Sequence, residues 1–166
     1  MAIVLGIDPG GAATGMVLRE RDTVRAYAVI ERRKLTVLAY LRAVSDAIEP
    51  LAGQIDHVAI EGLVAPSPYI GGKKQLIKPE HVMNVSVTYG WVLSVVVHGL
   101  DLEPIIVRPD GHGSRHEARS LDVRRLYPAE LIGPREGPAG TGILRHARSA
   151  WDIAGTVRAV RPGHVR

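Results

Sequence analysis

Three acidic residues stand where the chain could bring them together for metal-ion chemistry. Asp8 follows an apolar run in IVLGIDPGG, and Glu61 ends a second short apolar run in DHVAIE. If these runs are neighbouring parallel strands, both carboxylates leave the sheet at the edge where open α/β sheets bind ligands. Asp152 lies in RHARSAWDIAG near the C-terminus. Carboxylates in this number are the ligands that a pair of divalent ions needs in order to hold a phosphate group.

Each acid also has a simpler explanation. Asp8 precedes a Pro-Gly pair, and Asp, Pro and Gly all favour turns. Glu61 could be solvated at its strand end, and Asp152 could pair with Arg148, one helical turn earlier. The hypothesis of a shared site therefore depends on the joint placement of the acids and on no single one of them.

Length and composition indicate one globular domain. The 166 residues suit a single domain, and 46% of them are hydrophobic, which is enough for a core. No run approaches the roughly 18 uninterrupted apolar residues of a membrane span, and the first twenty residues lack the basic start of a signal peptide. We expect one domain over residues 1–161, a loose tail at 162–166 and no membrane association.

The lack of cysteine and the charge distribution limit the chemistry. Without cysteine there is neither a disulfide framework nor a thiolate zinc site, so a metal would bind to oxygen and imidazole ligands, as magnesium and manganese do. A cysteine-free chain also fits a reducing cytoplasm. The chain from residue 108 onward holds 11 Arg against 6 acids, a mild indication of a polyanionic partner or simply a solvated surface.

The hydrophobic pattern predicts the elements that position these residues. We expect strands at 3–7, 14–19, 24–30, 56–61 and 103–107, and helices at 35–48, 80–98, 117–127 and 143–160. Three antiparallel strands followed by alternating helices and strands describe an α/β fold, a mixed sheet with helices on both faces.

Two of the expected helices have unusual faces. The helix at 80–98 is apolar almost all round, so we expect it to be buried on most sides, in the core or at a subunit contact. In the helix at 143–160, Arg145, Ser149 and Asp152 share one stripe, while Trp151 and Ile153 supply apolar surface on the other side. This helix can therefore pack on the sheet and aim Asp152 at its edge.

Four blocks in order along the chain resemble the RuvC Holliday-junction resolvases. These blocks are GIDPG followed by TG, then AIEG, VTYGWVLSVVV and SAWDIAG, and the pattern HARSAWD resembles a divergent, phage-associated branch. The resemblance implies an RNase H-like fold with a five-stranded mixed sheet, order 3-2-1-4-5, in which strand 2 is antiparallel. It also implies a homodimer that nicks branched DNA at four-way junctions and leaves 5′-phosphates, in the cytoplasm of a bacterial cell or a phage-infected host.

By position, the resemblance assigns Asp8, Glu61 and Asp152 as the catalytic residues and metal ligands. It implies two Mg²⁺ ions per active site, for which Mn²⁺ can substitute, with Asp8 bridging both ions and Glu61 and Asp152 each holding one. A fourth ligand, Asp or His, is usual one helical turn before the last Asp, but Ser149 stands there in this chain. His146 is the alternative candidate for this position.

The resemblance also indicates which groups would touch DNA. The candidates for DNA binding are Lys73, Lys74, Lys78, Arg108, Arg145 and Arg148. Better-known members insert an aromatic residue into the junction just after the catalytic Glu, but this chain has no phenylalanine. The candidates for such a wedge are Leu63, Val64, Tyr69, Ile70 and the Leu-Ile pair at 76–77.

Two other functions compete with the nuclease. A RuvC-like module that binds branched DNA but cuts it weakly would explain why Ser149 replaces an acid. An actin-like protein that binds ATP phosphates also begins with a GIDPG–TG turn, but it needs a second, repeated domain, and we find no repeat in 166 residues. A metal titration of DNA cutting and DNA binding separates the nuclease from the binding module.

Overall fold

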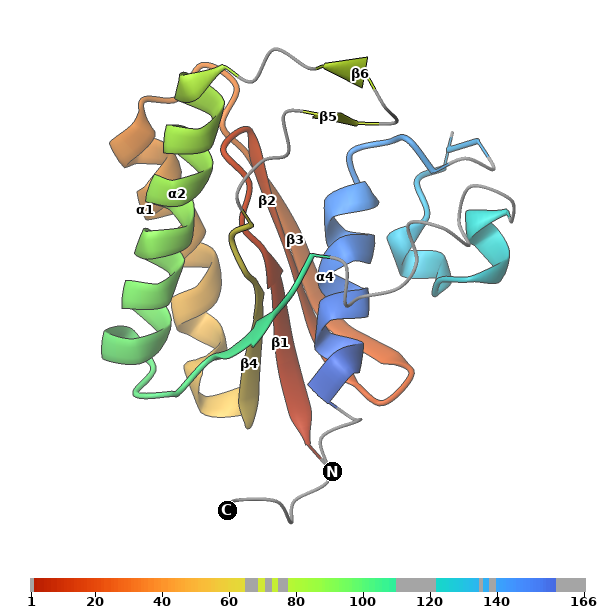
Figure 1. The fold of residues 1–166 in the computed structure, drawn as a ribbon. Helices are drawn as coiled ribbons and strands as arrows, with labels where there is room; N and C mark the ends of the chain where they lie inside the picture. The colour runs from red at the N-terminus through yellow and green to blue at the C-terminus, as the bar shows by residue number, and fades with distance from the viewer. Residues whose placement is uncertain are drawn as a thin grey trace.

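A five-stranded mixed sheet forms the centre of the protein (Figure 1). The computed structural model describes residues 2–64, 69–70, 73–74, 78–109, 122–134, 136–137 and 140–157. The strands are β1 (Ile3–Asp8), β2 (Ala13–Glu20), β3 (Thr23–Glu31), β4 (His57–Glu61) and β7 (Ile105–Val107). Their order is β3-β2-β1-β4-β7, with β2 antiparallel to both neighbours and β4 parallel to β1 and β7. The predicted fold is confirmed, and its fifth strand is β7.

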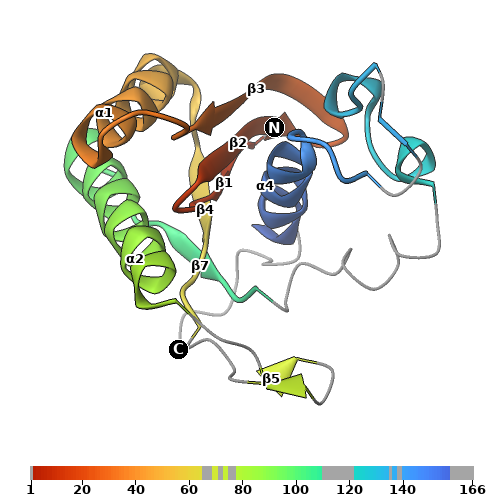
Figure 2. The same cartoon turned by 90° about the horizontal axis from the view of Figure 1, so that it is seen from above.

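Helices cover both faces of this sheet, as the sequence predicts. The helices α1 (Val37–Ile48) and α2 (Pro79–Ser94) lie on one face, and α4 (Arg145–Thr156) lies on the other (Figure 2). Short 3₁₀ segments occur at Glu49–Gln54, Val123–Arg125 and Ala129–Leu131, and a π-helical turn at Val95–Gly99 continues α2. Two short strands, β5 (Tyr69–Ile70) and β6 (Lys73–Lys74), pair with each other and lie between β4 and α2 in the sequence.

Most of the expected helix at 117–127 lies outside the described residues. Its described end forms the 3₁₀ turn Val123–Arg125 instead of an α-helix. The tail at 162–166 and the expected last residues of the C-terminal helix, 158–160, also fall outside the described part of the chain.

The helix α1 begins two residues later than its periodicity predicts, because a side chain caps it. The hydroxyl of Thr36 accepts a hydrogen bond from the backbone N–H of Ala39, at 3.2 Å, which satisfies one free donor of the first turn. From this start, helical spacing directs Tyr40, Leu41 and Val44 into the core beneath the sheet.

The helix α2 is not buried on most sides within one chain, so the alternative of a subunit contact stays a prediction. Thr88 and Val92 are its buried residues, whereas Met83 is 67% exposed and Val87 is also exposed. Pro79–Gly99 is long and apolar enough, by length and composition only, to cross a membrane, which is weak evidence when one helix alone passes the test. The hydrogen bond from Trp91 Nε1 to Ser45 Oγ, 2.8 Å long, ties α2 to α1 on the sheet.

The helix α4 lies directly on the backbones of β1 and β2, where two glycines make room for it. A Cβ atom at Gly6 would stand 2.0 Å from the carbonyl oxygen of Ala150. A Cβ atom at Gly15 would stand 2.1 Å from the carbonyl oxygen of His146. These separations are impossible for real atoms, so any larger residue at either position must push the helix away from the sheet.

We therefore expect Gly6→Ala to lower the free energy of unfolding by about 3 kcal/mol, the upper end of the usual cost of overpacking. Gly53→Ala is the matched control, because a Cβ at Gly53 meets nothing within 4 Å, and it should change stability by less than about 0.5 kcal/mol. Urea unfolding followed by circular dichroism measures both. Equal stability of the two variants would contradict the close contact of α4 with β1.

Candidate active site

Asp8 and Glu61 meet at the carboxyl ends of two parallel strands. β1 and β4 are neighbours, with Ile7 opposite Ile60, and each acid follows one residue later on its strand. The two carboxyl groups lie near enough to interact, and this interaction lowers the pKa of Asp8. The strand-end placement expected from the sequence therefore brings these two acids together.

The helix α4 adds two polar side chains to this pair. His146 Nδ1 lies 3.2 Å from Asp8 Oδ2, and Ser149 lies near enough to lower the pKa of Asp8. An ionised carboxylate only accepts hydrogen bonds, so Nδ1 of His146 carries the hydrogen in this contact. Both alternative ligand positions considered from the sequence thus lie at Asp8.

These contacts decide the charge of Asp8. Burial would raise its pKa, but hydrogen bonds from His146, with Glu61 and from Ser149, together with the charge of His146, hold the pKa below its ordinary value of 3.8. Asp8 is therefore the ionised member of the pair. Two bare carboxylates in contact repel each other, so the pair must share either a proton or a cation.

A buried tyrosine fixes the turn that follows Asp8. Tyr40 Oη donates to the carbonyl of Gly10 at 2.7 Å, and it lies 2.6 Å from Thr14 Oγ1, which can donate to it in turn. Burial raises the pKa of Tyr40, so its hydroxyl stays neutral and able to donate. Sequence analysis missed this role, although a tyrosine on the apolar face of a predicted helix is a usable signal.

Asp152 has a tyrosine as its hydrogen-bond partner. It accepts a hydrogen bond from Tyr127 Oη, at 2.8 Å. Three residues after Ser149, its direction from the helix axis differs by about 60°. Within the described residues, no group of three His, Asp or Glu side chains is arranged to hold a metal ion. The contacts of Asp8 therefore involve Glu61, His146 and Ser149, and the place of Asp152 in the site stays a prediction.

The donor set at Asp8 and Glu61 fits a divalent cation. Two adjacent carboxylates and a hydroxyl are hard oxygen ligands of the type that bind magnesium or manganese, and the imidazole is a borderline ligand beside them. A cation between the carboxylates would also relieve the repulsion that their contact otherwise creates. A second ion held by Asp152 has no such support from the described geometry.

Arg148 corrects the expectation that it contacts DNA or holds Asp152. Its side chain is 4% exposed and is paired with Glu136, which is 3% exposed, by hydrogen bonds of 2.6 and 2.8 Å. It also donates to the carbonyls of Leu131 and Gly140, at 2.7 and 2.6 Å. Its role is to anchor the segment before α4.

The other predicted DNA-binding residues are on the surface where the structure describes them. Lys78, Arg108 and Arg145 are exposed, and Arg145 begins α4 beside His146. Only the backbones of Lys73 and Lys74 are described, as β6. Among the wedge candidates, Leu63 and Val64 are exposed. The side chains of Tyr69 and Ile70 and the whole 76–77 pair lie outside the described part.

Comparisons with known proteins define the fold. No family model and no curated protein matches the sequence. Thermus thermophilus RuvC, in complex with a Holliday junction substrate, has a TM-score of 0.63 at 15% identity, over 92% of this chain and 90% of that chain. A second T. thermophilus RuvC structure has a TM-score of 0.57, with the same identity and coverage. Fowlpox virus resolvase, with substrate Holliday junction DNA, has 0.53 at 12% identity, over 93% and 98%. The fold of this chain is therefore RNase H-like, of the kind seen in RuvC.

We expect Glu136→Gln to cost about 3–5 kcal/mol of unfolding free energy, because it leaves the charge of Arg148 buried without its partner. The exposed Glu130, in the same segment, provides the control Glu130→Gln, which should change stability by less than about 0.5 kcal/mol.

The same pair predicts a pH dependence. Hydrogen bonds from Arg148 hold the pKa of Glu136 below its ordinary value of 4.5 despite burial. The stability from this ionised group is complete above pH 4.5 and is lost as the pH falls through the lower folded-state pKa. Urea unfolding across that range should show the loss in wild type and a smaller one in Glu136→Gln. Parallel pH curves for the two proteins would contradict the assignment.

Proposed function

We propose that the protein is a metal-dependent nuclease that cuts branched DNA, with Asp8 and Glu61 at its reaction centre. The observation that carries this proposal is the contact between these two carboxyl groups at the ends of adjacent parallel strands. His146 and Ser149 complete the group. The RNase H-like fold, which this chain shares with resolvases solved on Holliday junctions, adds support of a more general kind.

Each residue of the site has a separate role in phosphodiester hydrolysis. Asp8 and Glu61 would hold a divalent cation, which supplies a nucleophile from water at neutral pH and neutralises charge on the phosphate. His146 orients Asp8 through its Nδ1–H, which leaves its other ring nitrogen, Nε2, to take up or release a proton. Tyr40 keeps the turn after Asp8 in place through the Gly10 carbonyl.

The finer features of the proposal rest on the sequence resemblance. They are four-way junctions as substrate, two Mg²⁺ ions per site with Mn²⁺ as a substitute, 5′-phosphate products, and a cytoplasmic location in a bacterial cell or phage-infected host. A second ion would be held by Asp152, which accepts a hydrogen bond from Tyr127 at one of its carboxylate oxygens. A homodimer is supported by the exposed apolar residues Val82, Met83 and Val87 of α2, which a second copy could cover.

A catalytically weak module that binds branched DNA is the second candidate. It is favoured by Ser149, which contacts Asp8 where a third acid would complete a metal site. It is also favoured by the position of Asp152, which faces Tyr127. Junction binding without nicking, even at high Mg²⁺ or Mn²⁺, would establish this function in place of the nuclease.

For the nuclease, we expect Asp8→Asn to slow nicking of a labelled four-way junction in Mg²⁺ by about 100-fold or more, because the ionised ligand is lost. Junction binding in EDTA should stay within about twofold of wild type, since affinity comes mainly from cationic contacts to phosphates. Asp46→Asn is the control, an exposed acid on α1, and should cut normally. An Asp8→Asn protein that cuts at the wild-type rate would exclude this site.

Ser149→Asp tests whether position 149 belongs to the metal site. An added carboxylate beside Asp8 should lower the Mg²⁺ concentration needed for half-maximal nicking, and Mg²⁺ should raise the melting temperature more than in wild type. Both effects follow from the same charge, since a third acid repels the other two unless a cation is bound. An unchanged or higher Mg²⁺ requirement would place Ser149 outside the ligand shell.

A further inference from the structure

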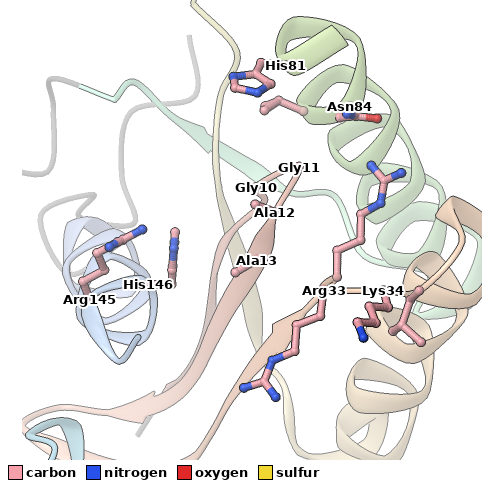
Figure 3. Close-up of a pocket in the computed structure, with 13 residues that line it drawn as sticks. Gly10, Gly11, Ala12, Ala13, Arg33, Lys34, His81, Asn84, Arg145 and His146 are labelled. Atoms are coloured by element: carbon pink, nitrogen blue, oxygen red, sulfur yellow. The ribbon is translucent and has the colours of Figure 1, made fainter. Parts of the chain in front are cut away.

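A basic pocket lies beside the Asp8–Glu61 pair, and apart from His146 its lining residues have no role in the proposed chemistry. It has a volume of about 640 Å³. The turn at residues 10–13 forms its floor, with His81 and Asn84 from α2 on one side and Arg145 and His146 from α4 on the other (Figure 3). His146 also contacts Asp8, so the pocket and the candidate active site share a wall.

Six of the thirteen residues that line this pocket are basic, and none of these described lining residues is acidic. Its basic side chains are Arg32, Arg33, Lys34, His81, Arg145 and His146. Arg33 is paired with Glu31, at 2.7 Å. Arg32, Lys34 and Arg145 have no ion-pair partner in the part of the chain that the structure describes. Three uncompensated positive charges around one pocket attract a ligand that carries more than one negative charge.

Backbone contacts hold the pocket in shape. The N–H of Arg32 donates to the carbonyl of Ala12 at 2.9 Å, which ties the linker after β3 to the turn after Asp8. The N–H of Leu35 donates to the carbonyl of Arg32 at 2.7 Å. On the other side, a Cβ at Gly11 would stand 2.8 Å from Cβ of Asn84, so the turn lies directly against α2. These contacts therefore hold in place the backbone that carries the basic side chains of the pocket.

We propose that this pocket binds the DNA strand next to the phosphate that is cut, with Arg32, Lys34 and Arg145 contacting its neighbouring phosphates. The proposal rests on the proposed nuclease function. The volume lies within the range of about 300–1,000 Å³ that holds ligands much larger than one phosphate. A strand that runs from the pocket past His146 reaches Asp8 without crossing any acidic side chain of the pocket lining. Phosphate contacts of this kind set the register of the substrate.

The test compares two double variants that lose the same charge. Arg32→Gln/Lys34→Gln removes cations from the pocket. Arg21→Gln/Arg42→Gln removes two exposed arginines that do not line it, of which Arg21 follows the opposite end of β2. Binding of a labelled four-way junction is measured in EDTA over a series of salt concentrations. The pocket variant should bind about tenfold more weakly, and its salt slope should fall by about 1 for each lost phosphate contact. The control should stay near wild type.

Nicking in Mg²⁺ separates this proposal from the proposed function. The pocket variant should raise KM and leave kcat within about threefold, since its residues contact neighbouring phosphates and not the reacting one. If wild type nicks the junction but both double variants have the same Kd and salt slope, the pocket proposal is wrong and the nuclease stands. If wild type binds without nicking and only the pocket variant loses affinity, the nuclease is wrong and the pocket stands.

A free nucleotide is the other phosphate-bearing ligand that could occupy the pocket, and a separate experiment tests it. ATP titrated into wild type and the pocket variant by calorimetry should show no saturable binding at micromolar concentrations. Micromolar ATP binding that disappears in Arg32→Gln/Lys34→Gln, with junction binding unchanged, would overturn the DNA-strand proposal and assign the pocket to a nucleotide.

Discussion

The direct contact of α4 with the backbones of β1 and β2 is the constraint on which the candidate site depends. Gly6 and Gly15 carry no side chain where the helix lies, so the helix backbone reaches the strands. That approach brings His146 and Ser149 to Asp8, at the end of the same strand that Gly6 belongs to. A helix held one side-chain layer further out would leave Asp8 and Glu61 without these partners. The packing of α4 on the sheet therefore determines which side chains lie at the site.

Charge is arranged around this contact in two different ways. Asp8 and Glu61 concentrate negative charge at the sheet edge, while Arg32, Lys34 and Arg145 surround the adjoining pocket with positive charge. In the proposed nuclease, the first group attracts a cation and the second attracts the DNA that the cation acts on. Arg148 takes no part in this field, because Glu136 neutralises it inside the protein. An arginine one position from Ser149 thus serves stability alone.

Features that follow from a repeating sequence pattern, such as strands and helix faces, can be predicted from the sequence. Features that depend on irregular tertiary contacts cannot. Parallel strands with acids at their ends correctly place Asp8 beside Glu61, because the register of β1 and β4 follows from their apolar runs. Helical periodicity puts Ser149 and Asp152 on one stripe but cannot say how α4 is rotated on the sheet. The glycine contacts set that rotation, and they turn Asp152 toward Tyr127.

The other differences have the same origin. The partner of Arg148 lies in an irregular segment, so no spacing rule connects it to Glu136. The apolar composition of α2 indicates burial, but Thr88 and Val92 are its buried residues, and Met83 and Val87 are exposed in the single chain. The pocket depends on the contact of the Arg32 N–H with the Ala12 carbonyl, which joins two turns that are distant in sequence. Such contacts are decided by tertiary packing and not by local pattern.

The most direct test of this account is to locate Mn²⁺ in crystals of the protein by its anomalous X-ray scattering. Because Asp8 and Glu61 form the ligand pair, the account predicts a peak between their carboxylates, with His146 and Ser149 beside it, and the loss of that peak in Asp8→Asn crystals. A peak at Asp152 that excludes Asp8, or an empty Asp8–Glu61 pair in crystals that bind Mn²⁺ elsewhere, would contradict it.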